Sequence, residues 1–407
     1  AVLGELLAET IERQEGAETR SLVQRVRELS VSARGHNEEA SEDLQTLLAE
    51  LDLPRVTVLV RALLTFFNLA NIAEQVHRGE VGDPVTLAGT FERVLDTVGR
   101  DEVARAGLDL ELRPVLTAHP TDASRRTVLT KLSLVGDMLA LPPDGSPTGQ
   151  LRRRRRLAES IDLLWQTDEL RIGRPGPLDE ARTAVYYLDE ILAEQLLDLF
   201  EAYGDLLRDA GIEPPPDMVP IRFGTWVGGD RDGNPNVTPA ITEEVMRMQG
   251  DRALSTIADA IRVLSRQLSN SSRIAGVSED FTRSIEDDRA RWPELYDRYE
   301  RLNREEPYRM KCRFIGRRLA ATRERILDDQ ASSSDCYHHP DELLADLELM
   351  HRSLCANRGQ LIAEGPLARV MRLVSTFRFH LATMDVREHA GKHHEALAAI
   401  FARVGLD

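Results

Sequence analysis

Hydrophobic residues recur at helical spacing through most of this chain. They do so from Leu3 to about Arg34 and again from Asp43 to Leu51, in a background rich in charged residues. Pro54 can open a third helix, running to about Arg78, because a proline in the first helical turn sacrifices no hydrogen bond. The same spacing predicts helices at about 85–98, 124–139, 152–171, 179–192, 239–330, 340–361 and 367–374. We therefore expect a predominantly helical protein.

Three apolar runs break this pattern because they are too short for helices. They cover 112–118, 219–227 and 377–387, and each predicts a short strand. Each run delivers polar residues at its carboxyl end: His119 after the first, a glycine-rich loop after the second, and Asp385 with Arg387 at the end of the third. An α/β barrel builds its site from several strand ends at one face. We therefore expect a helix-rich α/β fold with a site at the strand ends, although three strands cannot close a barrel.

The loop after the second run is the densest unit of unusual residues in the sequence. Three glycines fall within 228–233, around the charged triplet Asp230-Arg231-Asp232. Glycine loses more conformational entropy on folding than any other residue, so the cluster either makes a sharp turn or lets the backbone approach another group closely. The charges are either solvated or paired with each other. Because the two aspartates can neutralise Arg231 locally, the triplet is expected to hold the loop in shape.

His119 has two interpretations. At the end of a strand it places an imidazole at the carboxyl edge of a sheet, where α/β folds collect active-site groups. Alternatively, Thr117 or Thr121 caps the histidine in an ordinary turn. Isolated histidines are more often structural than catalytic, so His119 needs support from other residues before a catalytic role follows.

Composition limits the class of protein. The 407 residues carry a net charge of −16 with a pI near 5.2, which argues against a protein that mainly coats nucleic acid or an anionic membrane. The five consecutive arginines at 152–156 then indicate a solvated helix face or a set of ion pairs. No aromatic residues interleave with them, as single-stranded nucleic-acid binding would favour.

Cysteine usage and hydropathy indicate a reducing, aqueous compartment. The three cysteines are scattered and show no C-x-x-C spacing, so neither a disulfide framework nor a thiolate zinc site is expected. The first residues are acidic where a secretory signal would need a basic start. The most apolar long stretch, 56–73, is interrupted by Arg61, Asn68 and Asn71, which places it short of a membrane span. We expect a soluble cytoplasmic protein.

Metal and nucleotide motifs are weak or missing in the sequence. His389 and His393 stand four residues apart and could share one helix face, as in some zinc sites. The glutamate that the zincin pattern places directly after its first histidine is absent, since Ala390 occupies that position. The glycine-loop signatures of nucleotide-binding proteins and the G-x-S-x-G signature of serine hydrolases are also absent.

Taken together, the three strand-end motifs resemble phosphoenolpyruvate carboxylase. Val115–Thr121, followed by Arg125-Arg126, is similar to the catalytic-histidine signature of that family, and Phe223–Pro239 is similar to its long glycine and Asp-Arg-Asp-Gly-Asn-Pro signature. Met384–Arg387 resembles the third site segment. Supporting matches are Phe67–Arg78, Trp165–Arg171 and Pro177–Arg182. The resemblance spans nearly the whole chain in order.

The resemblance implies a cytoplasmic enzyme of anaplerotic carbon fixation. Such an enzyme joins bicarbonate to phosphoenolpyruvate and gives oxaloacetate and phosphate, with Mg²⁺ or Mn²⁺ as the metal. Bicarbonate attacks the phosphate to form carboxyphosphate and the enolate of pyruvate, and the enolate then captures carbon dioxide. The matching positions imply His119 for the carboxylation step and Arg387 for holding the phosphate. Trp226 would be a hydrophobic wall against water, and Arg231 is a further candidate for substrate binding.

Two departures from the family pattern qualify this picture. Arg378 stands where the family motif commonly has glycine. The chain is also roughly half as long as family members. The resemblance therefore implies one incomplete domain over 1–407, with a helical lead-in over 1–110. Residues 111–407 would hold the first strands of a (β/α)8 TIM-type barrel with many inserted helices.

The missing half is where the resemblance places the metal ligands, so no metal-binding residue is assigned in this chain. The complete enzyme would be a homo-tetramer that binds neither nucleic acid nor membranes. The first hypothesis is an incomplete carboxylase that is inactive alone. The alternative is a non-catalytic helical scaffold or regulatory fragment that retains the motifs.

Overall fold

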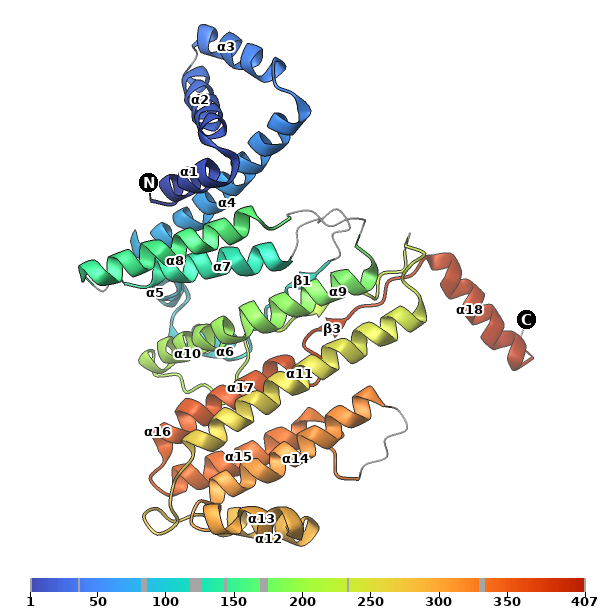
Figure 1. The fold of residues 1–407 in the computed structure, drawn as a ribbon. Helices are drawn as coiled ribbons and strands as arrows, with labels where there is room; N and C mark the ends of the chain where they lie inside the picture. Colours follow the sequence, from blue (N-terminus) through green and yellow to red (C-terminus); the bar gives the residue numbers. More distant parts are fainter. Residues whose placement is uncertain are drawn as a thin grey trace. The chain divides into compact units, whose positions relative to one another are not determined.

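Helices make up most of the structure, as the hydrophobic spacing predicts (Figure 1). The structure is a computed structural model. It describes residues 2–35, 37–81, 86–117, 126–142, 145–168, 175–232, 234–328 and 334–405. The chain divides into two compact units: Ala1–Thr86 with Thr121–Arg174, and Leu87–Pro120 with Pro175–Asp407. We call these unit 1 and unit 2.

Unit 1 is an all-helical bundle. Its core holds Leu6, Ile11, Leu69, Ile161 and Trp165, each at most 2% exposed. Its helices are α1 (Val2–Glu15), α2 (Ala17–Arg34), α3 (Glu38–Ala49), α4 (Leu53–Val81), α7 (Arg126–Ala140) and α8 (Pro147–Trp165).

Two helices of unit 1 are shorter than predicted. The helix expected over 3–34 is split between α1 and α2 at Gly16, whose φ of 92° lies outside the helical range. The helix expected to reach residue 171 ends at Trp165, and residues 169–174 lie outside the described part of the chain.

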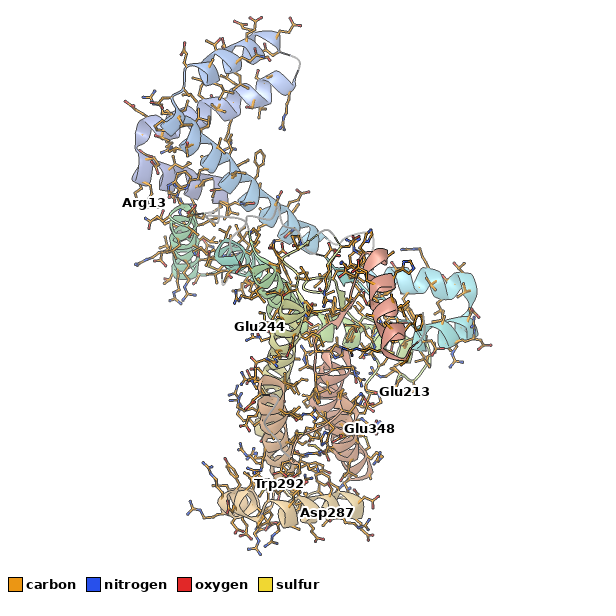
Figure 2. All side chains as sticks on the ribbon, turned by 90° about the vertical axis from the view of Figure 1, so that its right-hand side faces the viewer. Arg13, Glu213, Glu244, Asp287, Trp292 and Glu348 are labelled. Atoms are coloured by element: carbon orange, nitrogen blue, oxygen red, sulfur yellow. The ribbon has the colours of Figure 1, made fainter. Side chains whose placement is uncertain are left out.

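Ion pairs account for part of the arginine run 152–156. Arg154 pairs with Glu9 at 2.6 Å and Arg155 with Glu159 at 3.0 Å. Arg13, labelled in Figure 2, ties α1 to α8 in the same way through Asp162, at 2.6 Å. These contacts agree with the ion-pair interpretation of the run.

Helix α4 is more apolar than the sequence argument allowed. Within the described residues, its segment Leu53–His77 is the one helix long and apolar enough to cross a membrane by length and composition alone. Arg61, Asn68 and Asn71 therefore do not disqualify it, contrary to our expectation. A core helix of a soluble protein passes the same test, and Leu59, Ala62 and Leu69 of α4 are buried in the core of unit 1.

Unit 2 contains a small sheet and many helices. Its main core includes Phe200, Phe281, Tyr337, Leu347 and Phe377, each at most 1% exposed. The helices before the second strand are α5 (Leu87–Val98), α6 (Arg100–Leu108), α9 (Pro177–Tyr186), the π-helix η1 (Tyr187–Leu192) and α10 (Ala193–Asp209). After it come α11 (Pro239–Gln267), α12 (Glu279–Arg291), α13 (Pro293–Asn303), α14 (Pro307–Leu327), α15 (Pro340–Ala356), α16 (Gln360–Ile362), the π-helix η2 (Ala363–Leu367), α17 (Ala368–Phe377) and α18 (Ala390–Arg403).

The long helix predicted over 239–330 is four separate helices, α11 to α14. Pro293 and Pro307 each stand in the first turn of a helix, where the missing amide proton costs nothing. The helix start predicted at Pro340 is confirmed. Helix α11 begins at Pro239, where the pattern becomes helical, and the Thr238 side chain caps it by accepting from the amide of Ile241 at 3.3 Å. The hydrophobic pattern located the helical segments but missed two prolines as breaks.

A buried ionic network joins three of these helices. Lys311 on α14 is 2% exposed, and its Nζ lies 2.7 Å from a carboxylate oxygen of Asp288 on α12 and 2.8 Å from one of Asp346 on α15. Asp346 also accepts from Arg318 at 3.0 Å and from the Tyr337 hydroxyl at 2.7 Å. Desolvation raises the pKa of Asp288 above its ordinary value, although Lys311 opposes the shift. The network is a polar tie inside an otherwise apolar helix interface.

Three short parallel strands in the order β1-β2-β3 form the sheet. They are β1 (Val115–Leu116), β2 (Gly224–Thr225) and β3 (Thr383–Met384), so all three predicted strand regions contain a strand. Backbone pairing extends beyond the strands, from a bridge between Leu112 and Ile221 to one between Asp230 and Arg387. The predicted helix-rich α/β fold with a small sheet is therefore confirmed.

The third predicted strand begins too early. Phe377 ends α17, and the chain then turns before β3 starts at Thr383. The turn contains two residues with left-handed backbone angles, Arg378 with φ 48° and Leu381 with φ 57°. Arg378 is the residue that stands where the family motif commonly has glycine, and its φ value gives the physical reason for that preference. Its Nη2 donates to Asp341 at 2.8 Å, so an ion pair accompanies the unfavourable backbone angle.

Candidate functional site

The carboxyl ends of β2 and β3 bring two of the predicted motifs together. The amide of Asp385 donates to the Thr225 carbonyl at 2.9 Å, and the amide of Arg387 donates to the Gly229 carbonyl at 3.0 Å. The amide of Arg231 in turn donates to the Arg387 carbonyl at 2.8 Å. The glycine-rich loop and the Met384–Arg387 segment therefore run side by side as one ladder. The motif at the end of β1 includes His119, which lies outside the described residues.

Two glycines of this loop allow close approach of neighbouring groups. A Cβ on Gly229 would lie 2.3 Å from the carbonyl oxygen of Asp385, closer than any side chain tolerates. Gly228 has a φ of 85°, and a Cβ there would meet Val245 at 2.7 Å. The sequence left open a plain sharp turn or a close backbone approach, and the structure shows both. Without a glycine at 229, β3 could not come close enough to place Arg387 beside the loop.

Arg387 meets Asp230 through a bidentate ion pair. Its Nε lies 2.8 Å from Oδ1 of Asp230 and its Nη2 lies 2.8 Å from Oδ2. This planar two-bond geometry is the strongest arrangement available to an arginine and a carboxylate. The hydrogen bond to Asp230 raises the pKa of Arg387 above its ordinary value. The expectation that Asp230 and Asp232 neutralise Arg231 is wrong for Asp230, whose described partner is Arg387.

Trp226 lies under the same guanidinium. The guanidinium carbon of Arg387 is 4.9 Å from the centre of the indole ring, within the range of a cation–π contact. The carbonyl of Trp226 accepts from the amides of Gly229 at 2.9 Å and Asp230 at 3.0 Å, which closes the turn. Two of the predicted site residues, Trp226 and Arg387, are therefore in direct contact.

Arg231 makes its described side-chain hydrogen bond elsewhere. Its Nη2 donates to Oγ1 of Thr242 on α11 at 3.1 Å. Thr242 is 7% exposed and also donates to the Gly228 carbonyl at 2.7 Å, so it links the loop to the first turn of α11. The Nε of Arg231 is buried and has no hydrogen-bond partner among the described residues. This side chain joins the loop to the helix, and its predicted role in substrate binding stays a prediction.

Divalent metal ions have no ready set of ligands in the described part of the chain. It contains no group of three or more His, Cys, Asp or Glu side chains that could hold a metal ion. At the site itself, the carboxylate of Asp230 is occupied by Arg387. His389 accepts from the amide of Gly391 at 3.1 Å as the cap of α18, and His393 is exposed. The residues described here do not fit a magnesium or zinc centre.

Two contacts of the candidate site escaped the sequence analysis. The pairing of Asp230 with Arg387 joins residues 157 positions apart, and no local pattern identifies such a partner. The link from Arg231 to Thr242 was also missed. A signal for the first contact did exist: both residues follow predicted strands, and parallel neighbours bring their carboxyl ends to one edge.

Sequence comparison places this chain in a known family. The family model for phosphoenolpyruvate carboxylase matches residues 1–407. The chain belongs to the phosphoenolpyruvate carboxylase family. It is 33% identical to a phosphoenolpyruvate carboxylase of Roseiflexus castenholzii over 99% of this chain and 45% of the relative. It is 34% identical to one of Azorhizobium caulinodans, over 98% of this chain and 44% of the relative.

Length separates this chain from those phosphoenolpyruvate carboxylases. A third relative, from Acinetobacter baumannii, is 32% identical over 100% of this chain and 45% of its own length. The chain therefore spans about half the length of the curated relatives it matches, and the matched part is the amino-terminal half. The resemblance in the sequence motifs is confirmed at the level of the family.

Proposed function

We propose that this chain forms the phosphate-binding side of a phosphoenolpyruvate carboxylase active site. The reaction is the carboxylation of phosphoenolpyruvate with bicarbonate to give oxaloacetate and phosphate. The observation that carries this proposal is Arg387, held at the carboxyl edge of the sheet by Asp230 and lying over Trp226. A planar guanidinium suits a phosphate dianion, and an indole face beside it excludes water.

Arg387, Trp226 and His119 serve different steps of this reaction. A bicarbonate oxygen attacks phosphorus, the bond from phosphorus to the enol oxygen breaks, and its electron pair stays on the enolate. Arg387 stabilises the charge on the phosphoryl group during this transfer. Carboxyphosphate then releases carbon dioxide and phosphate, and C3 of the enolate attacks carbon dioxide. Trp226 keeps water from protonating the enolate, and His119 serves the carboxylation step.

The proposal includes the parts that this chain lacks. Its sheet has two outer edges, on β1 and on β3, and a cavity of about 910 Å³ lies beside β3 between α11 and α14. Further strands and helices of a (β/α)8 barrel would pair with these edges and fill this space. We assign them, the ligands of Mg²⁺ or Mn²⁺ and the contacts of a homo-tetramer to the other half of the relatives. The site of action is the cytoplasm.

An assay of bicarbonate-dependent oxaloacetate formation tests the proposal. We expect no turnover from the 407-residue chain alone and turnover when the other half is supplied on the same or a second polypeptide. In that active form, Arg387→Ala should lower kcat/KM roughly 100-fold or more. Arg378→Ala is the control, because Arg378 pairs with Asp341 rather than with the site. Robust turnover by the chain alone would show that the other half is dispensable.

The alternative is a non-catalytic scaffold that retains the motifs. It predicts that phosphoenolpyruvate does not bind even when the other half is present, and that Arg387→Ala changes nothing. His119→Asn adds a separate test of the chemistry. If His119 serves carboxylation, this variant should lose oxaloacetate formation more than phosphate release. Equal losses of both products would contradict that role.

A further inference from the structure

Asp230 occupies one complete edge of the Arg387 guanidinium. Both contacts are 2.8 Å, one to Nε and one to Nη2, so the carboxylate lies in the guanidinium plane. Arginine carries five N–H donors, and the neighbouring edge is formed by Nη1 with the second proton of Nη2. Nη1 makes no hydrogen bond with any residue that the structure describes. The ion pair therefore leaves one defined edge of the arginine for an anion.

Three restraints act on the same arginine from different directions. The backbone ladder fixes its main chain through Gly229 and Arg231. The Trp226 ring lies against the guanidinium at 4.9 Å, and the Asp230 carboxylate fixes its rotation about the side-chain axis. The ladder and the ring would still allow the guanidinium to turn within its plane. The carboxylate is the contact that removes this freedom.

Asp230 is itself fixed within the loop. Its amide donates to the Trp226 carbonyl at 3.0 Å, and its Oδ1 accepts from the amide of Asp232 at 3.3 Å. Its side chain is 25% exposed, compared with 46% for Arg387. The carboxylate is therefore set by the turn before any substrate binds, and it can orient the more exposed arginine. Losing less side-chain entropy on binding is the usual benefit of such preorganisation.

We propose that Asp230 is a positioning residue that turns the Nη1 edge of Arg387 toward the phosphate of the substrate. This inference rests on the proposed function, because it needs Arg387 to bind that phosphate. Positioning and simple electrostatics predict opposite effects on phosphate binding when the Asp230 carboxylate is removed. A carboxylate beside an anion site repels the anion, so its removal alone should strengthen binding. If the carboxylate positions Arg387, its removal should weaken binding of the phosphate.

The test compares Asp230→Asn with Asp232→Asn in the catalytically active form of the protein. Both variants remove one negative charge that acts on Arg387, but Asp232 is exposed, and the ion pair described for Arg387 is with Asp230. Asparagine keeps the shape of aspartate, so unfolding midpoints of the two variants should be similar. We expect Asp230→Asn to raise KM for phosphoenolpyruvate roughly tenfold with a smaller change in kcat, because it loosens binding of the phosphate. Asp232→Asn should leave KM unchanged or lower it.

A second variant guards against a loss of fold. Asp230→Glu keeps the carboxylate on a longer side chain and should recover part of the lost affinity. A lower KM in Asp230→Asn, or the same KM change in both asparagine variants, would overturn the inference. If Arg387→Ala leaves kcat/KM intact, the proposed function fails instead. If Arg387→Ala abolishes activity while Asp230→Asn equals Asp232→Asn, the inference alone fails.

Discussion

The guanidinium carbon of Arg387 lies 4.9 Å from the centre of the Trp226 ring. This contact joins the ends of β2 and β3, and it suggests a second role for Trp226 beside the proposed one of a wall against water. A cation over an aromatic face is stabilised by the quadrupole of the ring, and an aliphatic side chain cannot replace that term.

Replacing Trp226 separates these two roles. Trp226→Phe keeps an aromatic face and should change KM for phosphoenolpyruvate little in the active form of the enzyme. Trp226→Leu stays hydrophobic but loses the face, and should raise KM roughly two- to fivefold. Steady-state kinetics of the two variants measure the difference. Equal KM values for phenylalanine and leucine would show that only water exclusion matters.

Substitution of Gly229 should displace β3. The Cβ of Gly229→Ala would lie 2.3 Å from the Asp385 carbonyl, so the two backbones must separate, at a cost of about 2–3 kcal/mol in the free energy of unfolding. The control is Gly316→Ala within α14, where a Cβ meets nothing within 4 Å. This variant should raise the free energy of unfolding by about 1 kcal/mol, because alanine favours the helix more than glycine does. Chemical denaturation of both variants gives the comparison. A stable Gly229→Ala variant would contradict the close approach.

Arg378 offers a position where glycine should be better than alanine. With φ 48° and ψ −133°, the backbone lies in a region that favours glycine. Both Arg378→Gly and Arg378→Ala lose the ion pair to Asp341, so their difference isolates the backbone. We expect the glycine variant to be more stable by about 1 kcal/mol.

The control for this comparison is an arginine within a helix. Arg262 on α11 also holds an ion pair, to Asp259 at 2.6 Å, but its backbone is helical. There alanine should be more stable than glycine by about 1 kcal/mol. Unfolding free energies of the four variants test the reversal, and the same order at both positions would contradict it.

Lys311 should be among the most sensitive positions for stability. Lys311→Met leaves Asp288 without its buried cation, while Asp346 keeps Arg318, and should cost about 3–5 kcal/mol at neutral pH. Lys392→Met is the control, because the ion pair of Lys392 with Glu395 is exposed and its loss should change little.

The loss in Lys311→Met should also depend on pH. Lysine now lowers the pKa of Asp288, which burial alone raises, so its removal lifts that pKa further above the unfolded value. A carboxyl group whose pKa is higher in the folded state destabilises that state at pH values above the folded-state pKa. This destabilisation fades as the pH falls toward the pKa of the same group in the unfolded chain. The stability difference from the parent chain should therefore shrink as the pH falls from neutral toward the ordinary pKa of an aspartate, 3.8. A difference independent of pH would point to lost packing rather than to an uncompensated charge.

The sequence predicted the parts of this structure that depend on local chemistry. Helical spacing located most helices, and the end of each apolar run located the polar groups of β2 and β3. Breaks at Gly16, Pro293 and Pro307 could also have been read from the residues, since each has a specific backbone requirement.

What could not be predicted depends on contacts between distant segments. The partner of Asp230 is fixed by the register between β2 and β3, which puts residue 230 opposite residue 387. The left-handed angle at Arg378 follows from the turn between α17 and β3, and arginine itself gives no sign of it. The family resemblance marked the position as unusual before the structure supplied the reason.

The sheet that builds the site joins segments very far apart in sequence. Thr225 meets Leu116 across 109 residues, and Arg387 meets Asp230 across 157. Strands of two residues offset little of the entropy of closing such loops, so we expect the helices to fold first and bring the strand ends together. The ion pair of Arg387 with Asp230 should then be among the last features to form during folding. Partial opening of the folded state should then release the sheet before the helices. Hydrogen exchange at the amides of Trp226 and Asp385 should therefore be faster than exchange in α11.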